Sequence, residues 1–378
     1  MLHSLKNAIK SNSLTKAIYL KVQSFLILLQ YKLIVRYYKN KTPTCNRSLT
    51  CDVESKKPVV FYFGGDELQD KSGFLQALST VSDVTYFTKE DNSYGSYSFG
   101  ILNKNKNVSK NRKRLLELLD KMETTPDILL MQTWEWRIGL ETLQQVKKLY
   151  PKLKIVNIAM DDRHSYWIYG MKNLGSAGLI PALDAVFTTS SEAVEWYKKE
   201  GVNAFFYPLA SEPLIFHPIN IPKIHDVGFV GAKYGIREVI VEKLIDKGIN
   251  VKAYGNGWES GRLPIDDTNK FYNQCRIVLG VGTILGCNDF TSMKLRDFDV
   301  PMSGSVYLTN YNQDTAEIFA EESEICFYRN VDECVAVVSE LLSNERKLHQ
   351  IRENTLLKAL ENTYIHRVKE LLKNVGYE

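Results

Sequence analysis

Short apolar runs recur along this chain from residue 57 onward, separated by glycine-containing turns and helix-length segments. These runs cover residues 58–63, 127–131, 154–159, 184–190, 201–208, 226–231, 251–254, 276–282, 306–309 and 324–328. Apolar runs of strand length that alternate with helical segments predict buried parallel strands joined by helices. The alternation therefore predicts an α/β protein.

The length of 378 residues suits two such domains, because domains of about 150–200 residues can each bury a core of their own. Three prolines between residues 209 and 222 interrupt the alternation, and a new strand begins at Asp226. We predict an N-terminal Rossmann-like domain over residues 58–222 and a C-terminal one over 223–378. Residues 1–57 form a separate basic segment and linker.

The stretch 291–309 predicts a short helix, a break between Pro301 and Gly304, and a buried strand. Lys294, Arg296 and Asp299 lie on or beside this helix. A cation can neutralise phosphate and a carboxylate can accept hydrogen bonds from ribose, so this trio fits a nucleoside diphosphate. The alternative is an i,i+3 ion pair on the surface.

The sequence RDFDVPMSGSVYLT at residues 296–309 resembles the signature of the CgeB-like (spore-protein-like) glycosyltransferases, a GT-B branch related to group 1 glycosyltransferases. In that signature a glutamate is expected to hold the donor ribose, and Asp299 stands at its position. A group 1 enzyme usually has a second glutamate eight residues earlier, where this chain has Thr291. The resemblance covers residues 226–370 and, more loosely, extends back to about residue 58. It implies a GT-B fold, in which two Rossmann-type domains face a cleft and bind acceptor and donor respectively.

Glycine turns follow two strands of the second half, at Gly231 and at Gly255 and Gly257, and Arg237 lies on the helix after the first turn. Backbone N–H groups at such turns, together with an arginine, can bind a diphosphate. We therefore predict donor contacts at these residues and at Gly304. A dinucleotide fingerprint beginning at Gly280 is a weaker alternative, because no helix directly follows it.

Asp161, Asp162 and His164 follow the strand 154–159, at the end where parallel sheets place ligands. In an inverting transferase one of them would deprotonate the acceptor hydroxyl. Adjacent residues point in opposite directions, so one of the two aspartates should face the substrate. The alternative is a helix cap with a structural Arg–Asp pair.

The paired tryptophans 134 and 136 could stack on a sugar, or they could wedge between elements of the fold. Residues 89–113 are rich in Asn, Lys and Ser, which predicts a loop.

Residues 1–51 carry nine basic side chains and no acidic one, whereas the rest of the chain has 39 basic and 44 acidic residues. The longest uncharged window in this segment, Val22 to Tyr31, is too short to span a membrane. An interfacial amphipathic helix on an anionic membrane surface, through residues 1–40, fits this pattern. The alternative is a helix packed on the body of the protein.

The six cysteines lack metal-site spacing, so we predict reduced thiols, a cytoplasmic location and no metal site or cofactor. Within the cytoplasm, the basic N-terminal segment predicts a peripheral position on the inner face of the membrane. The charge distribution does not favour nucleic-acid binding. The predicted function is metal-independent transfer of a hexose-type sugar from a nucleotide-diphosphate sugar to a hydroxyl of a glycan or lipid-linked acceptor, in surface polysaccharide biosynthesis. The alternatives are a non-catalytic nucleotide-sugar-binding or scaffold protein and, with less support, a nucleotide-sugar epimerase.

Overall fold

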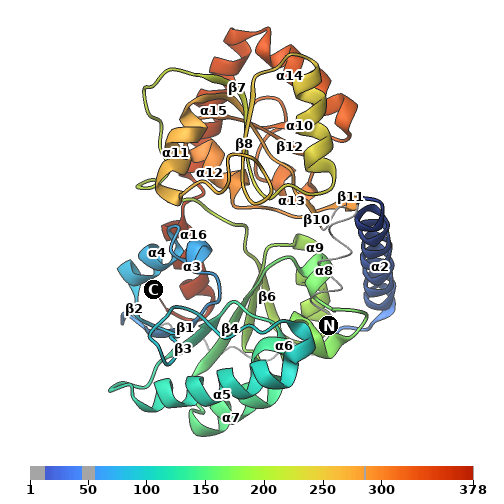
Figure 1. Ribbon diagram of the computed structural model, residues 1–378. Helices are drawn as coiled ribbons and strands as arrows, with labels where there is room; N and C mark the ends of the chain where they lie inside the picture. Colours follow the sequence, from blue (N-terminus) through green and yellow to red (C-terminus); the bar gives the residue numbers. More distant parts are fainter. Residues whose placement is uncertain (1–12, 45–55, 285–286, 378) are drawn as a thin grey trace. The chain divides into compact units, whose positions relative to one another are not determined.

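The computed structural model describes residues 13–44, 56–284 and 287–377, which form two compact units (Figure 1). The first unit comprises residues 30–209 and the C-terminal residues from Thr363 onward. The second unit comprises residues 210–362, and the first part of helix α2 (Ser13–Asn40), through Leu29, groups with it. Each unit is built on its own parallel sheet, so the predicted pair of Rossmann-like domains is confirmed.

The first unit contains a six-stranded sheet in the order β2-β1-β3-β4-β5-β6, and every pairing in it is parallel. Its strands are β1 (Val59–Phe63), β2 (Asp83–Tyr86), β3 (Ile128–Met131), β4 (Lys154–Ala159), β5 (Ala185–Thr188) and β6 (Asn203–Phe206). Its helices are α3 (Glu67–Asp70), α4 (Phe74–Val81), η1 (Ile101–Asn103), α5 (Lys104–Asp120), α6 (Glu135–Ile138), α7 (Leu140–Leu149), α8 (Asp162–Ser165), η2 (Lys172–Leu174), η3 (Ser176–Ala182), α9 (Ser191–Lys199) and α16 (Tyr364–Asn374).

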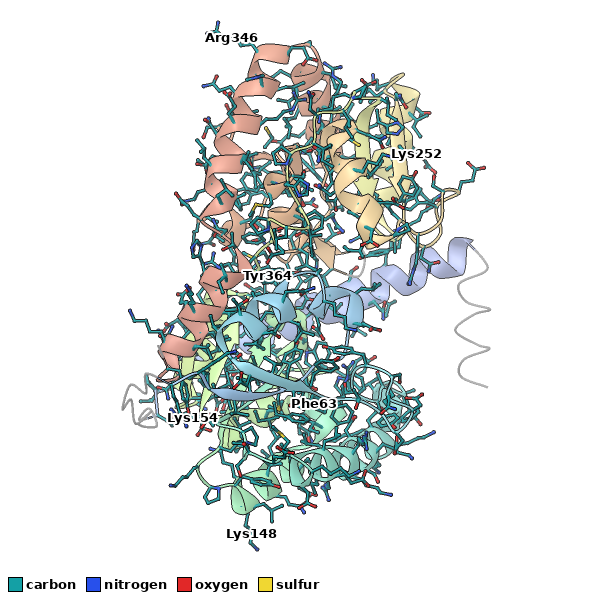
Figure 2. The ribbon with its side chains drawn as sticks, turned by 90° about the vertical axis from the view of Figure 1, so that its left-hand side faces the viewer. Phe63, Lys148, Lys154, Lys252, Arg346 and Tyr364 are labelled. Carbon is teal, nitrogen blue, oxygen red and sulfur yellow. The ribbon has the colours of Figure 1, made fainter. Side chains whose placement is uncertain are left out.

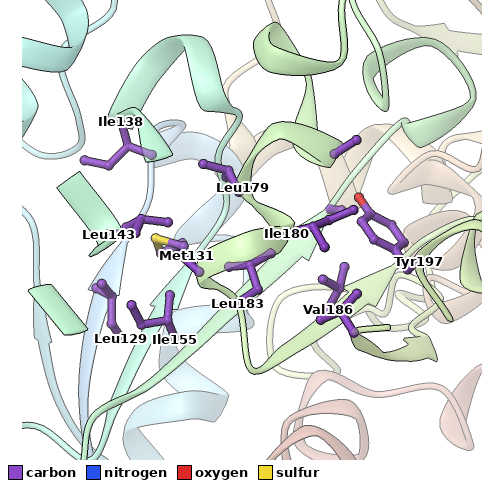
Figure 3. Packing of buried hydrophobic residues seen from close by; sticks show 14 of the residues in the cluster. Leu129, Met131, Ile138, Leu143, Ile155, Leu179, Ile180, Leu183, Val186 and Tyr197 are labelled. Atoms are coloured by element: carbon purple, nitrogen blue, oxygen red, sulfur yellow. The ribbon is translucent and has the colours of Figure 1, made fainter. Parts of the chain in front are cut away.

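The core of this unit forms where strand side chains meet the helices that cover them. Met131 and Ile155 come from neighbouring strands, and they gather with Leu179 and Leu183 of the segment before β5 (Figure 3). All of these side chains are buried. The central strands are apolar at nearly every position because both faces of the sheet are covered.

The second unit contains a five-stranded parallel sheet in the order β13-β12-β9-β7-β8, and a separate antiparallel hairpin, β10–β11. Its strands are β7 (His225–Val230), β8 (Val251–Tyr254), β9 (Cys275–Leu279), β10 (Thr283–Ile284), β11 (Cys287–Thr291), β12 (Val306–Asn310) and β13 (Cys326–Tyr328). Its helices are α10 (Ile236–Asp246), α11 (Ile265–Asn273), α12 (Arg296–Met302), α13 (Gln313–Ala316), α14 (Val331–Leu342) and α15 (Glu345–Leu360).

The chain passes from the first unit to the second at Leu209–Ala210, earlier than the predicted boundary at residue 222. Residues after this point are hydrogen-bonded to the second unit. The backbone N–H groups of His217 and Ile219 donate to the side chains of Asn269 and Asn273 on α11. The proline-rich stretch is therefore part of the second unit.

The last helix, α16, returns to the first unit. Tyr364 at its start packs edge-on against Phe74 of α4. Lys154, at the start of β4, donates a hydrogen bond to the carbonyl of Val375, and its ammonium lies over the ring of Tyr377. Figure 2 labels both Lys154 and Tyr364.

Two local sequence interpretations need correction. The polar stretch 89–113, predicted to be a loop, contains the beginning of α5, because Asn107 and Asn111 are buried and accept hydrogen bonds from the backbone of residues 97–99. The dinucleotide alternative at Gly280 is not supported, because Gly282 leads into the β10–β11 hairpin and not into a helix.

The second half of α2 packs on the first unit through residues spaced four apart. Gln30 donates hydrogen bonds to the carbonyls of His164 and Trp167 and accepts one from the N–H of Gly170. Ile34 and Tyr38 are buried in the core of the same unit. The alternative of a packed helix thus describes this half of α2, while residues 1–12 lie outside the described residues.

Candidate functional site

The carboxyl ends of β7 and β9 meet at one edge of the second sheet, because the two strands pair in parallel. Gly231 follows β7, and Val281 lies two residues beyond β9. Open parallel sheets bind ligands at this edge. Two arginines, from α10 and from the start of α12, lie here.

The guanidinium groups of Arg237 and Arg296 share the same surroundings. Both donate to the carbonyl of Val281, over 3.1 Å from Arg237 and 3.5 Å from Arg296. Both also lie over the ring of Phe229, with their Cζ atoms 5.8 and 5.7 Å from its centroid. The two predicted donor-binding arginines, 59 positions apart in the sequence, are thus brought together.

Neither guanidinium forms an ion pair with a carboxylate in the part of the chain that the structure describes, and the Nε atom of each is buried without a hydrogen-bond partner there. Arg237 is only 6% exposed. Burial and the neighbouring charge of Arg296 lower the pKa of Arg237 to about 10, so it remains a cation at neutral pH. Arg296 is partly exposed. Two neighbouring cations of this kind, neither of them in an ion pair within the described residues, favour the binding of an anionic ligand.

Asp299 lies one helical turn after Arg296, and its side chain is 7% exposed. Its Oδ1 accepts a hydrogen bond of 2.8 Å from the Ser211 hydroxyl. Burial raises the pKa of Asp299 to about 8, against the opposing effects of Ser211 and Arg296. At neutral pH the carboxyl is therefore mostly protonated, and it adds little negative charge beside the two arginines. Although burial lowers the pKa of Arg296, the surrounding Tyr307, Tyr272 and Asp297 raise it.

The predicted helix and strand at 291–309 are confirmed as α12 and β12, although Pro301 lies inside the helix. Lys294 precedes the helix, and its backbone N–H donates to Asp297, a buried residue that also accepts a short hydrogen bond from the hydroxyl of Tyr307. Asp297 thus fixes the start of α12 against β12, and with it the position of Arg296.

Gly231 and Gly255 pack directly against each other. A Cβ atom on Gly255 would lie 2.2 Å from the carbonyl oxygen of Gly231, and Gly255 and Gly257 both have positive φ angles, of 135° and 92°. Only glycine readily adopts such angles. The fold itself thus requires glycine at 255 and 257, in loops at the same sheet edge as the arginines.

Gly304 is separated from this cluster. It has φ 68° and ends α12 before β12 begins, so it lies at the amino end of a strand in the same sheet. A Cβ there would lie 2.9 Å from the Pro218 ring. Its predicted donor contact does not fit this position, which serves to end a helix.

The three candidates of the first unit differ from one another. Asp162 is 0% exposed and accepts hydrogen bonds from Ser176, Thr188 and Tyr197 over 2.6, 2.6 and 3.0 Å. Burial raises its pKa to about 6, against the effect of the three hydroxyls. The predicted role of Asp162 at an acceptor does not fit this enclosed position.

Asp161 and His164 are partly exposed at the carboxyl end of β4. Asp161 has φ 58° and ψ 32°, a left-handed conformation that costs a non-glycine residue about 1 kcal/mol. Such strain often occurs at functional sites. Asp161 is therefore the aspartate that remains a candidate.

Sequence reasoning missed three residues of the second-unit site: Phe229, Asp297 and Ser211. Phe229 is one apolar residue in a strand of apolar residues, and Ser211 lies 88 positions from Asp299. Asp297 alone had a signal, since it lies three residues after Lys294 at a helix start, the spacing of a side chain that caps a backbone N–H.

Within the described ranges, no three His, Cys, Asp or Glu side chains cluster as metal ligands do. Cys275, Cys326 and Cys334 are buried free thiols.

Residues 237–373 match the profile of a family of known proteins described as glycosyl transferase-like. No protein with a curated description matches the sequence.

Three solved structures share the fold at low sequence identity. Sucrose-phosphate synthase from Thermosynechococcus elongatus is 9% identical, with 84% of this chain and 98% of that chain covered and a TM-score of 0.59. The α,α-trehalose 6-phosphate synthase of Burkholderia multivorans is 9% identical, with 85% and 96% covered and a TM-score of 0.56. MnaA of S. aureus, solved with UDP, is 12% identical, with 85% and 96% covered and a TM-score of 0.51. The chain thus has the two-sheet fold of GT-B glycosyltransferases, and its residues 237–373 match a glycosyl transferase-like family.

Proposed function

We propose that the protein is a glycosyltransferase that moves a hexose-type sugar from a nucleotide-diphosphate sugar to a hydroxyl group of a glycan or lipid-linked acceptor, without a metal ion. We assign this reaction to surface polysaccharide biosynthesis. We also assign the protein to the CgeB-like branch, on the basis of residues 296–309. The pair of neighbouring arginines, the buried Arg237 and the partly exposed Arg296, is the observation that carries the proposal.

In the proposed reaction the acceptor oxygen forms a bond to the anomeric carbon while the bond from that carbon to the diphosphate oxygen breaks. The electron pair of the broken bond goes to the diphosphate, whose growing charge Arg237 and Arg296 stabilise. Asp299 binds the ribose hydroxyls through Oδ2, because Oδ1 is occupied by Ser211.

The acceptor side is assigned to Asp161 or His164. Either can take the proton of the acceptor hydroxyl in an inverting reaction. In a retaining reaction the same group would stabilise the transition state instead.

Isothermal titration calorimetry of the protein with nucleoside diphosphates, with and without magnesium, tests the proposal. UDP is the first nucleotide to test, since the structurally similar MnaA was solved with it. We expect saturable binding of one diphosphate that is unchanged when magnesium is chelated, and that weakens when Asp299 is replaced by alanine. Absence of binding for every nucleotide would favour the scaffold alternative.

Peripheral membrane attachment through α2 is also part of the proposal. No helix of the described residues is long and apolar enough to cross a bilayer. One face of α2 nevertheless exposes apolar side chains at helical spacing: Val22, Phe25, Leu26, Leu29, Leu33 and Tyr37. Lys21, Lys32, Arg36 and Lys39 are exposed on or beside this face. An apolar stripe bordered by cations, without an acidic residue, suits an anionic lipid surface.

Replacing Phe25, Leu29 and Leu33 with serine is expected to remove on the order of 3 kcal/mol of partitioning free energy, or about 100-fold in partition coefficient. Co-sedimentation with phosphatidylcholine vesicles, with and without phosphatidylglycerol, measures this. The control is Leu357→Ser on α15, where a leucine at least as exposed as those of the stripe lies outside it. Equal sedimentation of the triple variant and the control would contradict the membrane proposal.

A further inference from the structure

The first unit contains a guanidinium group whose hydrogen-bonding capacity is largely unused. Arg137 lies on α6, directly after β3, with its Cζ 5.2 and 5.1 Å from the ring centroids of Trp134 and Trp136. The two indole planes are nearly parallel, 11° apart. The paired tryptophans thus form two aromatic surfaces against which the guanidinium rests.

Few polar atoms contact this guanidinium. Its Nη1 is 3.4 Å from the hydroxyl of Ser96, a long hydrogen bond. Its Nε is buried and has no hydrogen-bond partner within the described residues, and the carboxylates of Asp66 and Asp70 act on it there through their charge, without a hydrogen bond. Burial lowers the pKa of Arg137, while the more distant Asp66 and Asp70 raise it. Arginine stays charged even when buried, so a partly desolvated cation remains here.

The loop after β1 leaves room for the guanidinium. A Cβ atom on Gly65 would lie 2.2 Å from Nη1 of Arg137, so the guanidinium rests against the bare main chain. Gly65 and Asp66 are exposed, which leaves this side of the site open to solvent. The neighbouring acid Asp70 is occupied elsewhere, since it accepts hydrogen bonds from the hydroxyls of Tyr62 and Tyr94.

Arg137 lies at the same edge of the first sheet as the candidate acceptor residue Asp161. Strands β1, β3 and β4 are consecutive neighbours in the parallel sheet, and Gly65, Arg137 and Asp161 follow their carboxyl ends. The three residues therefore share one edge of one sheet, in the unit that does not contain Arg237 and Arg296.

We propose that Arg137 and the Gly64–Gly65 loop bind an oxyanion, a phosphate or a carboxylate, that is carried by the acceptor. The inference rests on the proposed function and adds to it the chemical class of the acceptor. The planar fork of arginine binds two oxygens of such a group at once, and the indoles hold the fork in one orientation. The acceptor is then an acidic glycan or a phosphorylated one, not a neutral sugar.

The test uses the full chain with Arg237 and Arg296 both replaced by glutamine, so that inorganic phosphate does not bind at the donor site. Phosphate is titrated while tryptophan fluorescence is followed, because Trp134 and Trp136 adjoin the site. We expect a saturable change whose midpoint rises at least 10-fold when Arg137→Gln is added. Arg112→Gln, which removes a cation paired with Glu141 at the surface of the same unit, should leave the midpoint unchanged.

Acetate, titrated in the same way, distinguishes the two kinds of oxyanion, since the tighter ligand identifies a carboxylated or a phosphorylated acceptor. If chloride changes the fluorescence as much as phosphate and acetate do, the change is an effect of ionic strength only, and the proposal is overturned. An unchanged midpoint in the Arg137→Gln variant would overturn it as well. If that variant does not fold, Gly65→Ala should give the same loss, because its methyl group displaces the guanidinium.

The proposed donor site and the proposed oxyanion site can be contradicted independently of each other. Loss of nucleoside diphosphate binding with a normal phosphate response at Arg137 contradicts the proposed donor site alone. Normal diphosphate binding by the otherwise unaltered chain, with no phosphate response in the doubly substituted one, contradicts the acceptor site alone.

Discussion

Replacing Arg296 with glutamine is expected to weaken nucleoside diphosphate binding by about 10- to 100-fold without destabilising the fold, since a hydrogen bond to a charged group contributes about 1.5–3 kcal/mol. The stability of the variant should change little, because the repulsion between Arg296 and the buried cation Arg237 opposes the attraction between Arg296 and the neighbouring Asp297. Calorimetric titration and thermal unfolding measure the two effects.

The matched control is Arg329→Gln. Arg329 is half exposed and forms ion pairs with Glu321 and Glu333 on the surface of the same unit. Its loss should change stability by less than about 1 kcal/mol and leave the titration unchanged.

A double substitution at Arg237 and Arg296 tests whether they bind one ligand. If a single diphosphate contacts both, the loss from the double variant should be smaller than the sum of the two single losses. Unaltered diphosphate affinity in Arg296→Gln would rule out the site. A large drop in stability would mean that Arg296 has a structural role.

Replacing Asp162 with alanine is expected to destabilise the first unit by about 3–5 kcal/mol, because three hydroxyl donors lose their common acceptor inside the core. Asp162→Asn should be nearly as damaging, since its amide adds donors where acceptors are needed. The midpoint of urea unfolding measures the change.

Asp161→Gly is the matched control for this prediction. Glycine adopts the left-handed angles of position 161 without strain, so this variant should keep or gain stability while losing a candidate catalytic carboxylate. Reduced transfer at full stability would support Asp161 at the acceptor. Native stability of Asp162→Ala together with lost transfer would return that role to Asp162.

Local sequence patterns predicted the helices and strands of the fold, because whether a segment forms a helix or a strand depends largely on neighbouring residues. The apolar runs and their glycine turns identified the strands of both sheets, apart from the mostly exposed β2. The beginning of α5 was missed because Asn107 and Asn111 look like loop residues. Their spacing of four continues through the buried Leu115 and Leu119, which is the pattern of a helix with one buried face.

The site was less predictable because it depends on distant residues. Arg237 and Arg296 were each predicted from a local motif, but their shared contacts with Val281 and Phe229 arise from the pairing of β7 with β9. Asp161 and Asp162 are adjacent and chemically identical. The burial of Asp162 is decided by Ser176, Thr188 and Tyr197, which come from elements later in the chain.

The attachment of α2 to the first unit bears on how the chain can be shortened. Gln30 makes three hydrogen bonds to the backbone of residues 164–170, the segment that begins at His164. A truncation that removes residues 1–40 would therefore release this segment as well as the side chains proposed to contact lipid. Lost activity after such a cut would say nothing about membranes. A truncation that ends before Gln30 removes Val22, Phe25, Leu26 and Leu29 and keeps the contacts of Gln30. It therefore separates the proposed membrane contact from the integrity of segment 164–170.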